Sequence, residues 1–466
     1  MKTKRFFSLF LLMVLVLSLW TAPHAAALDD PEVQAKAALL VDAKTGNIVY
    51  AKNEHQEMYP ASTTKIMTAL LVMEAIDQGK LSLTDQLTAS HTAMTTGLAE
   101  DGSTANIQEG EIMTVEQYLT CMLVVSANEA CNVLAEAVSG SVEAFVDAMN
   151  DKAEELGCEN THFVNPSGLH DPQHYTSAWD LYLITKEAMQ YDDFMRICDT
   201  ATATIPATNL SEARTLHTSN YLIGAWWSRG YLYSDAHGIK TGSTSQAGHC
   251  LVSSATRGSL SFISVVLGAD RVTLDDGEIR TYSFYDTIQL FDWALDNFSY
   301  QSVLDSDEVI GEVPVTLSKI DHVTVHPAEE VEVLLPNDIH AEDLERNVVL
   351  EEPVEAPVQE GDVLGTLELR YNDTVYATVD LLAMHDVEAS RLLTFWHNVQ
   401  LFFQKTAVRV TAVILLVLLA AVLVWKLLLG RRRYRYGRSV GRGRLPRPPP
   451  SLRNKKRDCL RAVSFF

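Results

Sequence analysis

Two long apolar segments, one near each end of the 466-residue chain, constrain its fold most strongly. The first runs from Phe6 to Trp20, between a basic stretch at Lys2 to Arg5 and the small residues Ala25 to Ala27. A basic, an apolar and a small-residue region in this order are typical of a secretory signal peptide. We therefore expect residues 1–27 to direct export; an uncleaved anchor, the alternative interpretation, would also export the chain.

The second apolar segment predicts a transmembrane helix over residues 409–429. Its length matches the roughly 20 helical residues that cross the hydrocarbon core of a bilayer. The following residues, 430–466, are rich in arginine and proline. Because basic flanking segments stay on the cytoplasmic side, we expect a cytoplasmic tail, a cell-membrane location and an extracytoplasmic body.

Charge and cysteine content exclude several classes of protein. Of the 37 basic residues, 14 lie from Lys426 onward, whereas that segment holds one of the 60 acidic residues. The remaining body is strongly acidic, which argues against nucleic acid as a partner. The six cysteines show no Cys-x-x-Cys pair or zinc-type spacing, so we expect no disulfide framework.

Residues 28–298 read as one mixed domain in which helices pack on a sheet. A hairpin is predicted first, over residues 37–53, because two apolar stretches flank a turn that contains Gly46. Apolar spacing then predicts helices over 62–77, 114–138, 141–156, 177–190 and 281–297, and strands over 238–244, 249–255 and 260–267. Thr114 and Ser177 are the expected N-caps of their helices.

Residues 299–386 show short alternating strands and no helical spacing, which predicts a small all-β domain. In residues 387–408, apolar side chains return at helical period. This juxtamembrane segment either lies at the membrane surface as an amphipathic helix or extends the span outward.

A Ser-x-x-Lys pattern begins the first predicted helix, at Ser62 and Lys65. A serine at a helix start is commonly a cap. However, residues three apart share a helix face, so the amine of Lys65 can reach the hydroxyl of Ser62. The helix N-terminus also offers backbone N–H groups to a developing oxyanion.

Two further patterns follow in order. Ser126-Ala127-Asn128 interrupts an apolar helical stretch, and Lys240-Thr241-Gly242 lies on a predicted strand. Taken alone, the first could be a break between helices with its polar groups capped. A second Lys-Thr-Gly, at residues 44–46, falls in the predicted hairpin turn and precedes the candidate nucleophile, so only the later copy can line a cleft with Ser62.

Together these patterns form the signature set of penicillin-binding proteins and class A β-lactamases. From about Ala37 to Leu382 the chain resembles the low-molecular-mass D-alanyl-D-alanine carboxypeptidases. Supporting stretches are Tyr59–Ala61, Asn165–Leu169, Gly238–Ile239, Leu290–Trp293 and Gly361–Gly365. The resemblance implies an α/β (α+β) serine transpeptidase/β-lactamase-like domain, with an antiparallel sheet and helices, followed by the all-β domain and the transmembrane helix.

The resemblance also implies a role for each motif residue. The catalytic residues would be the nucleophile Ser62, the general base Lys65 and the proton relay Ser126. The substrate-binding residues would be Asn128, Lys240, Thr241, Gly242 and Ser243. The implied activity removes the terminal D-alanine from peptidoglycan pentapeptide stems, with β-lactams as covalent inhibitors and with no metal or other cofactor.

Four alternative functions share some of these sequence features. A D,D-endopeptidase acting on cross-linked stems would use the same residues. A β-lactamase would share them too, but the added β domain and anchor argue against it. A metal-dependent peptidase would need His162, His170 and His174 with Asp171, which lie in a loop without a His-Glu-x-x-His helix. A non-catalytic wall-binding scaffold would not need all motif side chains intact.

Overall fold

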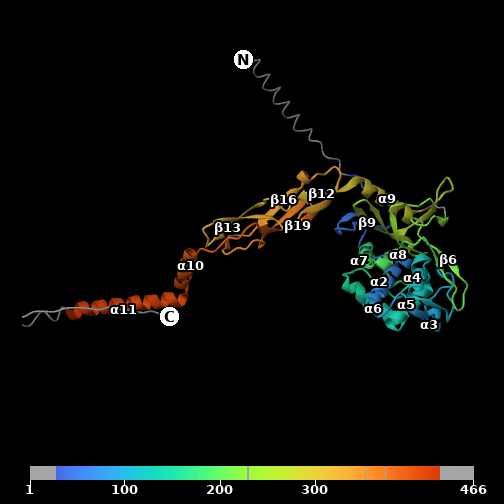
Figure 1. Ribbon diagram of the computed structural model, residues 1–466, viewed down its shortest axis with the longest axis horizontal. Coiled ribbons are helices and arrows are strands. Elements are labelled where there is room, and N and C mark those ends of the chain that lie inside the picture. The colour runs from blue at the N-terminus through green and yellow to red at the C-terminus, as the bar shows by residue number, and fades with distance from the viewer. Residues whose placement is uncertain (1–27, 228–229, 352, 373, 431–466) are drawn as a thin grey trace, which may run out of the picture. The chain divides into compact units, whose positions relative to one another are not determined.

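The computed structural model describes residues 28–227, 230–351, 353–372 and 374–430 (Figure 1). The predicted signal peptide and nearly all of the predicted basic tail lie outside these residues. The chain divides into two compact units. The first holds the described residues up to Pro314, with His322–Pro353 and Gln359–Asp386, and the second holds Val315–Asp321, Val354–Val358 and the described residues from Val387.

A five-stranded sheet lies at the centre of the first unit. Its order is β2 (Ile48–Lys52), β1 (Ala37–Asp42), β9 (Leu260–Ala269), β8 (Gly248–Arg257) and β7 (Ala236–Thr244), and every neighbouring pair is antiparallel. The predicted hairpin and three predicted strands are thereby confirmed. The N-terminal hairpin joins strands that come more than 200 residues later, so this sheet is completed by long-range pairing.

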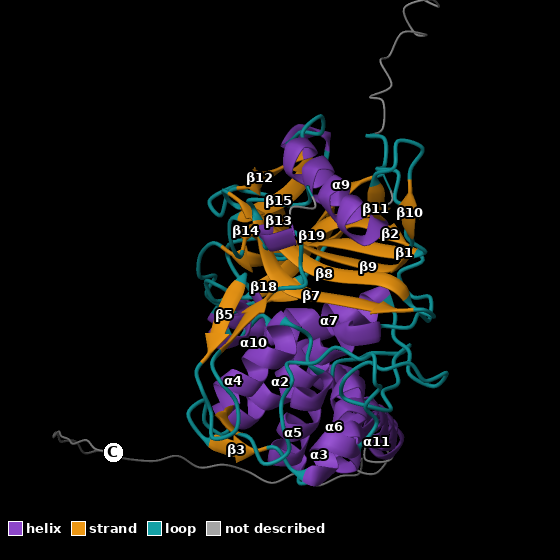
Figure 2. Cartoon of the chain, turned by 90° about the vertical axis from the view of Figure 1, so that its right-hand side faces the viewer, coloured by secondary structure: helices purple, strands orange, loops and turns teal. Residues whose placement is uncertain are grey.

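Helices cover both faces of the sheet, which explains why β1 is buried along its whole length (Figure 2). Because successive strand residues point to opposite faces, Leu39 and Val41 join one core, with the large helical layer. Ala38 and Leu40 join the other core, beneath α9 (Tyr282–Asn297).

The large helical layer contains α2 (Lys65–Asp77), α3 (His91–Thr95), α4 (Val115–Val124), α5 (Asn128–Ser139), α6 (Val142–Glu155), α7 (Ala178–Ala188) and α8 (Asp192–Cys198). Thr114 caps α4 in a full capping box with Gln117, and Ser177 caps α7, as predicted. The prediction of one helix over 114–138 was wrong. The chain leaves the helix at Val125, and Ser126 takes a left-handed conformation with φ of +67° before α5 begins.

Several short strands form two-stranded ribbons that the sequence did not predict. They are β3 (Gln86–Thr88) with β4 (Ile112–Thr114), β5 (Thr202–Ile205) with β6 (Arg214–His217), and β10 (Arg271–Thr273) with β11 (Ile279–Thr281). Each strand has three or four residues, too few to establish a period in the sequence.

The residues after α9 form the predicted all-β structure. Within the first unit, β12 (Phe298–Leu304) pairs with β15 (Val331–Pro336). A second sheet has the order β16 (Glu345–Leu350), β18 (Val363–Tyr371), β19 (Thr374–Ala383), β14 (His322–Pro327) and β13 (Gly311–Thr316). In the second unit, the end of β13 pairs in parallel with β17 (Val354–Glu355).

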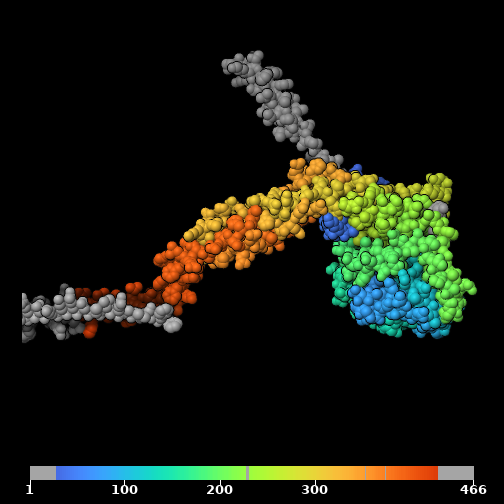
Figure 3. Space-filling model, viewed as in Figure 1, coloured from blue at the N-terminus to red at the C-terminus, as the bar shows by residue number. Residues whose placement is uncertain are grey.

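The second unit ends in two helices, α10 (Arg391–Gln404) and α11 (Thr406–Gly430), separated by Lys405 in an extended conformation. The stretch Thr406–Leu428 is long and apolar enough to cross a membrane, and none of it is buried within the protein (Figure 3). Helix α10 is therefore separate from the apolar helix α11, and its position at a membrane surface stays a prediction.

Candidate active site

Ser62 lies in a single 3-10 turn, η1 (Ala61–Thr64), that leads directly into α2. The hydroxyls of Thr63 and Thr64 donate to backbone carbonyls at the start of the turn, at 2.7 and 2.9 Å, and brace it. The turn has no side-chain cap at its start, so Ser62 is not a helix cap. Ser62 is half-buried, and its side chain lines the cavity described below.

Lys65 enters the core one turn later and has no exposed surface. Its Nζ lies 2.9 Å from Ser62 Oγ, 2.7 Å from Asn128 Oδ1 and 2.6 Å from the carbonyl oxygen of Ser167. Burial lowers the pKa of Lys65, because the charged ammonium loses its hydration, while the negative charge of Glu129 opposes that shift. The amine is thus both held against the candidate nucleophile and biased toward its neutral form.

The loop that supplies the Ser167 carbonyl is itself fixed on the nucleophile turn. The side-chain oxygen of Asn165 accepts hydrogen bonds from three following backbone N–H groups, at 2.7–3.2 Å. Gly168 has φ of +82°, and a Cβ at this position would lie 1.8 Å from the carbonyl oxygen of Ala61. Only glycine allows this contact, so the loop places its acceptor beside Lys65.

Ser126 lies at the break between α4 and α5, where no helical hydrogen bonds hold it. Its side chain lines the cavity, and its Oγ is buried without a hydrogen-bond partner among the described residues. A buried hydroxyl without a partner is uncommon, and a left-handed non-glycine residue is strained. Two residues later, the side chain of Asn128 turns inward to Lys65. The break between the helices therefore directs the Ser126 hydroxyl to the cavity and the Asn128 side-chain oxygen to the amine of Lys65.

Strand β7 forms the opposite wall, and Gly242 allows it to approach the nucleophile turn. A Cβ on Gly242 would lie 2.8 Å from the carbonyl oxygen of Pro60 and 3.1 Å from the nitrogen of Ser62. The neighbouring Thr241 and Ser243 line the cavity, and Thr241 Oγ1 lies 2.5 Å from Ser219 Oγ. The requirement for Gly242 is thus steric, as expected for a strand that another backbone segment approaches closely.

Lys240 points to the other side of β7 and is buried, with 1% of its surface exposed. Its Nζ donates to the carbonyl oxygen of Thr241 at 3.1 Å. Burial, and then the positive charge of Lys65, lower the pKa of Lys240 to about 7. Burial is the first cause of the lowered pKa at both lysines, because each charged ammonium loses its hydration.

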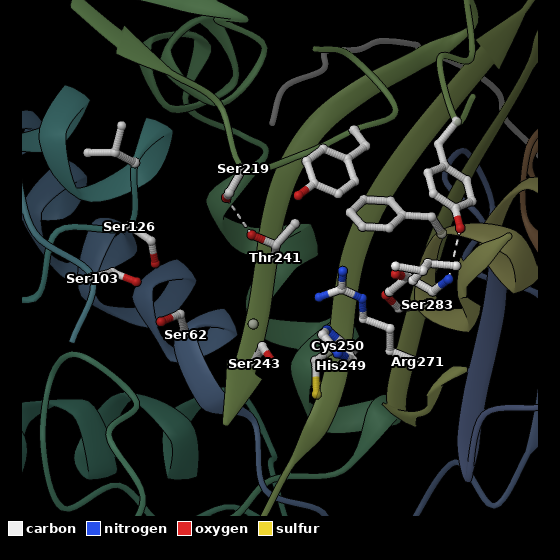
Figure 4. Close-up of a pocket in the computed structure, with 17 residues that line it drawn as sticks. Ser62, Ser103, Ser126, Ser219, Thr241, Ser243, His249, Cys250, Arg271 and Ser283 are labelled. Carbon is white, nitrogen blue, oxygen red and sulfur yellow. Dashed lines mark hydrogen bonds between the residues drawn. The ribbon is translucent and has the colours of Figure 1, made fainter. Parts of the chain in front are cut away.

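The eight predicted site residues thus come together around one cavity of about 240 Å³. Figure 4 shows Ser62 and Ser126 facing Thr241 and Ser243 across it. Gly242 also lines the cavity, whereas Lys65, Asn128 and Lys240 lie beneath its wall.

The cavity also holds residues that the motifs did not identify. Ser103 lies beside Ser126, Ser219 contacts Thr241, and Arg271 extends from β10 into the cavity (Figure 4). The guanidinium of Arg271 is exposed and forms no ion pair within the described part of the chain. No local sequence pattern identifies these three residues as part of the site. Only Arg271 has a weak signal, because it is a basic residue that closely follows a predicted strand in an acidic part of the chain.

The crowded histidines are structural. His174 is buried; its Nδ1 accepts from the backbone of Val164, so its Nε2 carries the proton and donates to Thr64 Oγ1 at 2.8 Å. Burial lowers the pKa of His174 to about 4, which keeps the ring neutral. The ring of His170 packs edge-on against Tyr59. No three His, Cys, Asp or Glu side chains in the described ranges are grouped to hold a metal ion.

Comparison with known families matches both parts of the chain. A family model described as D-alanyl-D-alanine carboxypeptidase matches residues 24–271, more than half of the chain. A second model, described as the C-terminal domain of penicillin-binding protein 5, matches residues 298–389, where the β strands lie.

Individual relatives agree with the family models. D-alanyl-D-alanine carboxypeptidase DacF of Bacillus subtilis is 32% identical over 398 residues, covering 84% of this chain and 97% of that protein. DacC of Escherichia coli, of the same description, is 30% identical over 379 residues and covers 79% and 88%. The structure of penicillin binding protein 5 from Haemophilus influenzae superposes with a TM-score of 0.63 at 28% identity, covering 78% of this chain and all of that one.

Proposed function

The chain belongs to the D-alanyl-D-alanine carboxypeptidase family of serine-type hydrolases, and on this premise we propose that it trims peptidoglycan pentapeptide stems through an acyl-enzyme on Ser62. The observation that carries the proposal is the 2.9 Å contact between Ser62 Oγ and the fully buried amine of Lys65. A hydroxyl is a weak nucleophile until a base accepts its proton, and a neutral amine at hydrogen-bond distance is such a base.

In the first step, Ser62 Oγ attacks the carbonyl carbon of the penultimate D-alanine while its proton passes to Lys65 Nζ. Asn128 and the Ser167 carbonyl hold that amine in place by the contacts already described. The carbonyl oxygen becomes an oxyanion. It would accept hydrogen bonds from the backbone N–H groups of Ser62 and Ser243, two residues that line the cavity.

In the second step, the carbon–nitrogen bond breaks, and the proton that Lys65 took from Ser62 passes to the departing amine, which returns Lys65 to its neutral form. Ser126 is the candidate relay, because its hydroxyl faces the cavity and lacks a protein partner in the described residues. D-alanine leaves, and the stem remains as an ester on Ser62. Water, deprotonated by Lys65, then attacks the ester carbonyl and restores the serine. A β-lactam would acylate Ser62 by the same first step.

The terminal carboxylate of the substrate would lie on the β7 side of the cavity. Thr241 offers a hydroxyl there, and Arg271 offers a guanidinium that forms no ion pair with the described residues (Figure 4). Lys240 lies beneath the wall, so it would act through its charge rather than by direct contact. Two cationic groups near one anion favour a substrate that ends in a free carboxylate.

The apolar helix Thr406–Leu428 is consistent with membrane anchoring. We place the catalytic domain outside the cytoplasm and the basic tail inside. That assignment is supported by the apolar segment before Ala25 and by the arginines that follow Gly430. The substrate in the cell wall and the enzyme would then share one compartment.

The direct test measures D-alanine released from a peptide that ends in Lys-D-Ala-D-Ala, with the full-length protein in detergent. We expect Ser62→Ala to reduce release by at least about a thousandfold. Thr45→Ala, in the unused Lys-Thr-Gly of the hairpin turn, serves as the matched control and should retain activity. Equal release by the Ser62→Ala and wild-type proteins would refute the proposal.

A further inference from the structure

We propose that the end of the active-site cavity beyond Thr241 and Arg271 is a subsite for an apolar side chain on the released residue. The enzyme would then accept stems that end in larger D-amino acids, such as D-phenylalanine, as well as in D-alanine. The inference rests on the proposed function, because it takes the terminal carboxylate to lie at Thr241 and Arg271.

The subsite is an aromatic wall formed by Tyr221, Tyr231 and Phe284, which line the same cavity as Ser62. The centroid of Phe284 lies 4.9 Å from that of Tyr221 and 5.3 Å from that of Tyr231. The two tyrosine centroids are 6.4 Å apart, and the three ring planes differ by at most 30°. The three rings therefore stack on one another as one aromatic cluster at the edge of the cavity.

The wall is larger than D-alanine requires. The side chain of D-alanine is one methyl group, whereas the cavity has a volume of about 240 Å³ and reaches from the nucleophile to all three rings. Tyr231 and Phe284 are more than nine-tenths buried, so packing holds both rings in place at the edge of the cavity before a substrate binds. A larger apolar or aromatic side chain would gain ring contacts that a methyl group cannot make.

Two contacts fix the wall relative to the proposed carboxylate site. Ser219 Oγ lies 2.5 Å from Thr241 Oγ1, and Tyr221 follows Ser219 by two residues. On the far side, Tyr231 Oη accepts from the backbone N–H of Thr281 at 2.8 Å, just before α9 begins. Because these two contacts hold both ends of the wall, binding of a substrate side chain would require little additional ordering of the protein.

The geometry of an amino acid connects the two sites. The carboxylate and the side chain of the terminal residue leave the same carbon atom. When the carboxylate contacts Thr241 and Arg271, the side chain lies within a few bonds of that point, in the same cavity as the rings. Tyr221 is half-buried and Ile279 is 43% exposed, so the wall reaches the cavity mouth and a longer side chain is not enclosed.

The test compares two peptides that differ in the last residue, Lys-D-Ala-D-Ala and Lys-D-Ala-D-Phe. Full-length protein in detergent is used, and the released amino acid is measured by chromatography. For the wild type we expect kcat/KM values for the two peptides within about tenfold of each other. In Tyr221→Ala we expect the D-Phe to D-Ala ratio of kcat/KM to fall about tenfold, the scale of one lost aromatic contact. Tyr221→Phe should keep the wild-type ratio.

Trp226→Ala is the matched control. Trp226 belongs to the same loop and is 64% exposed, but it stacks on His217 and does not line the cavity. It should leave both kcat/KM values unchanged.

Two results would overturn the subsite. One is a more than hundredfold preference of the wild type for D-Ala-D-Ala, a measurement that needs no variant to fold. The other is an unchanged ratio in Tyr221→Ala. Failure of the proposed function would look different, because D-alanine release would then persist in Ser62→Ala.

Discussion

A lysine can accept a proton near neutral pH only when its ammonium form is destabilised, and burial provides that condition at Lys65. The same residue must also be held within hydrogen-bond distance of the hydroxyl it activates. Three oxygen atoms around Nζ, from Ser62, Asn128 and Ser167, fix its position. Geometry and basicity are therefore set by the same buried environment.

Replacing Lys65 with methionine preserves the length of the side chain but removes the base. We expect Lys65→Met to lower kcat/KM for Lys-D-Ala-D-Ala by about a thousandfold, within the usual range for a lost general base. Lys44→Met is the control, because Lys44 belongs to the turn copy of the tripeptide and pairs on the surface with Glu332. Comparable loss of activity in both variants would count against a specific role for Lys65.

The two buried lysines predict a pH profile in which kcat/KM first rises and then falls as the pH increases. Activity rises with pH as Lys65 loses its proton, because only the neutral amine can accept one from Ser62. Activity then falls as Lys240, with a pKa of about 7, loses the positive charge that attracts the substrate carboxylate. In Lys240→Arg the side chain keeps its positive charge at all accessible pH values, so the fall in kcat/KM should occur at a higher pH. An alkaline limb that stays in place would show that another group produces it.

The eight predicted site residues could be identified from the sequence because seven belong to short local motifs and Ser243 directly follows the last motif. Ser103, Ser219 and Arg271 could not be, because they reach the cavity from loops and a ribbon far away in sequence. Only the tertiary fold brings them to the motifs.

At the scale of elements, the active site depends on the close approach of β7 to η1. The strand can lie against the nucleophile turn because Gly242 has no side chain. The Gly168 loop approaches the same turn from another side under a similar steric limit. Ser62 is therefore positioned by backbone contacts on two sides, which leaves it little freedom to move.

A methyl group at position 242 should separate these elements. We expect Gly242→Ala to lower kcat/KM by about a hundredfold, since its Cβ would lie 2.8 Å from a backbone oxygen and displace Ser62 from its base. Gly46→Ala, in the turn tripeptide, is the control; its φ of +79° predicts a stability loss of about 1 kcal/mol without loss of activity. Thermal unfolding and kinetics on both variants separate these effects.

Long elements with a clear period were predictable, including the hairpin, most helices and the central strands. The continuous helix predicted over 114–138 failed because apolar residues return at helical spacing after Asn128, whereas the backbone takes a left-handed conformation at Ser126. Periodicity reports which side chains are buried and not where a helix breaks. The ribbons were missed because their strands are too short to show a period.

At the scale of the whole molecule, two consecutive helices follow the β strands. The side chains of α10 include exposed Phe395, Trp396, Phe402 and Phe403, and α11 begins two residues after α10 ends. Large exposed aromatics beside an apolar span are typical of a helix at a membrane interface. The enzyme would then be held at the membrane both by α11, which crosses it, and by α10, which lies at its surface.

Two truncations separate these contributions. A chain that stops after Ser390 lacks both helices and should leave the membrane fraction while keeping its kcat/KM on a soluble peptide. A chain that stops after Gln404 retains α10 and should remain partly membrane-bound. Sedimentation with lipid vesicles gives the bound fraction. Full solubility of the second chain would exclude a membrane role for α10.

The central claim is that Ser62, activated by Lys65, forms the acyl-enzyme. Its most direct test is to treat the full-length protein with a penicillin, digest it, and locate the covalent adduct by mass spectrometry. The account predicts one adduct, on the peptide that contains Ser62, with slow formation in Lys65→Met and none in Ser62→Ala. An adduct on Ser126 or elsewhere, or no adduct on Ser62 in the wild type, would contradict it.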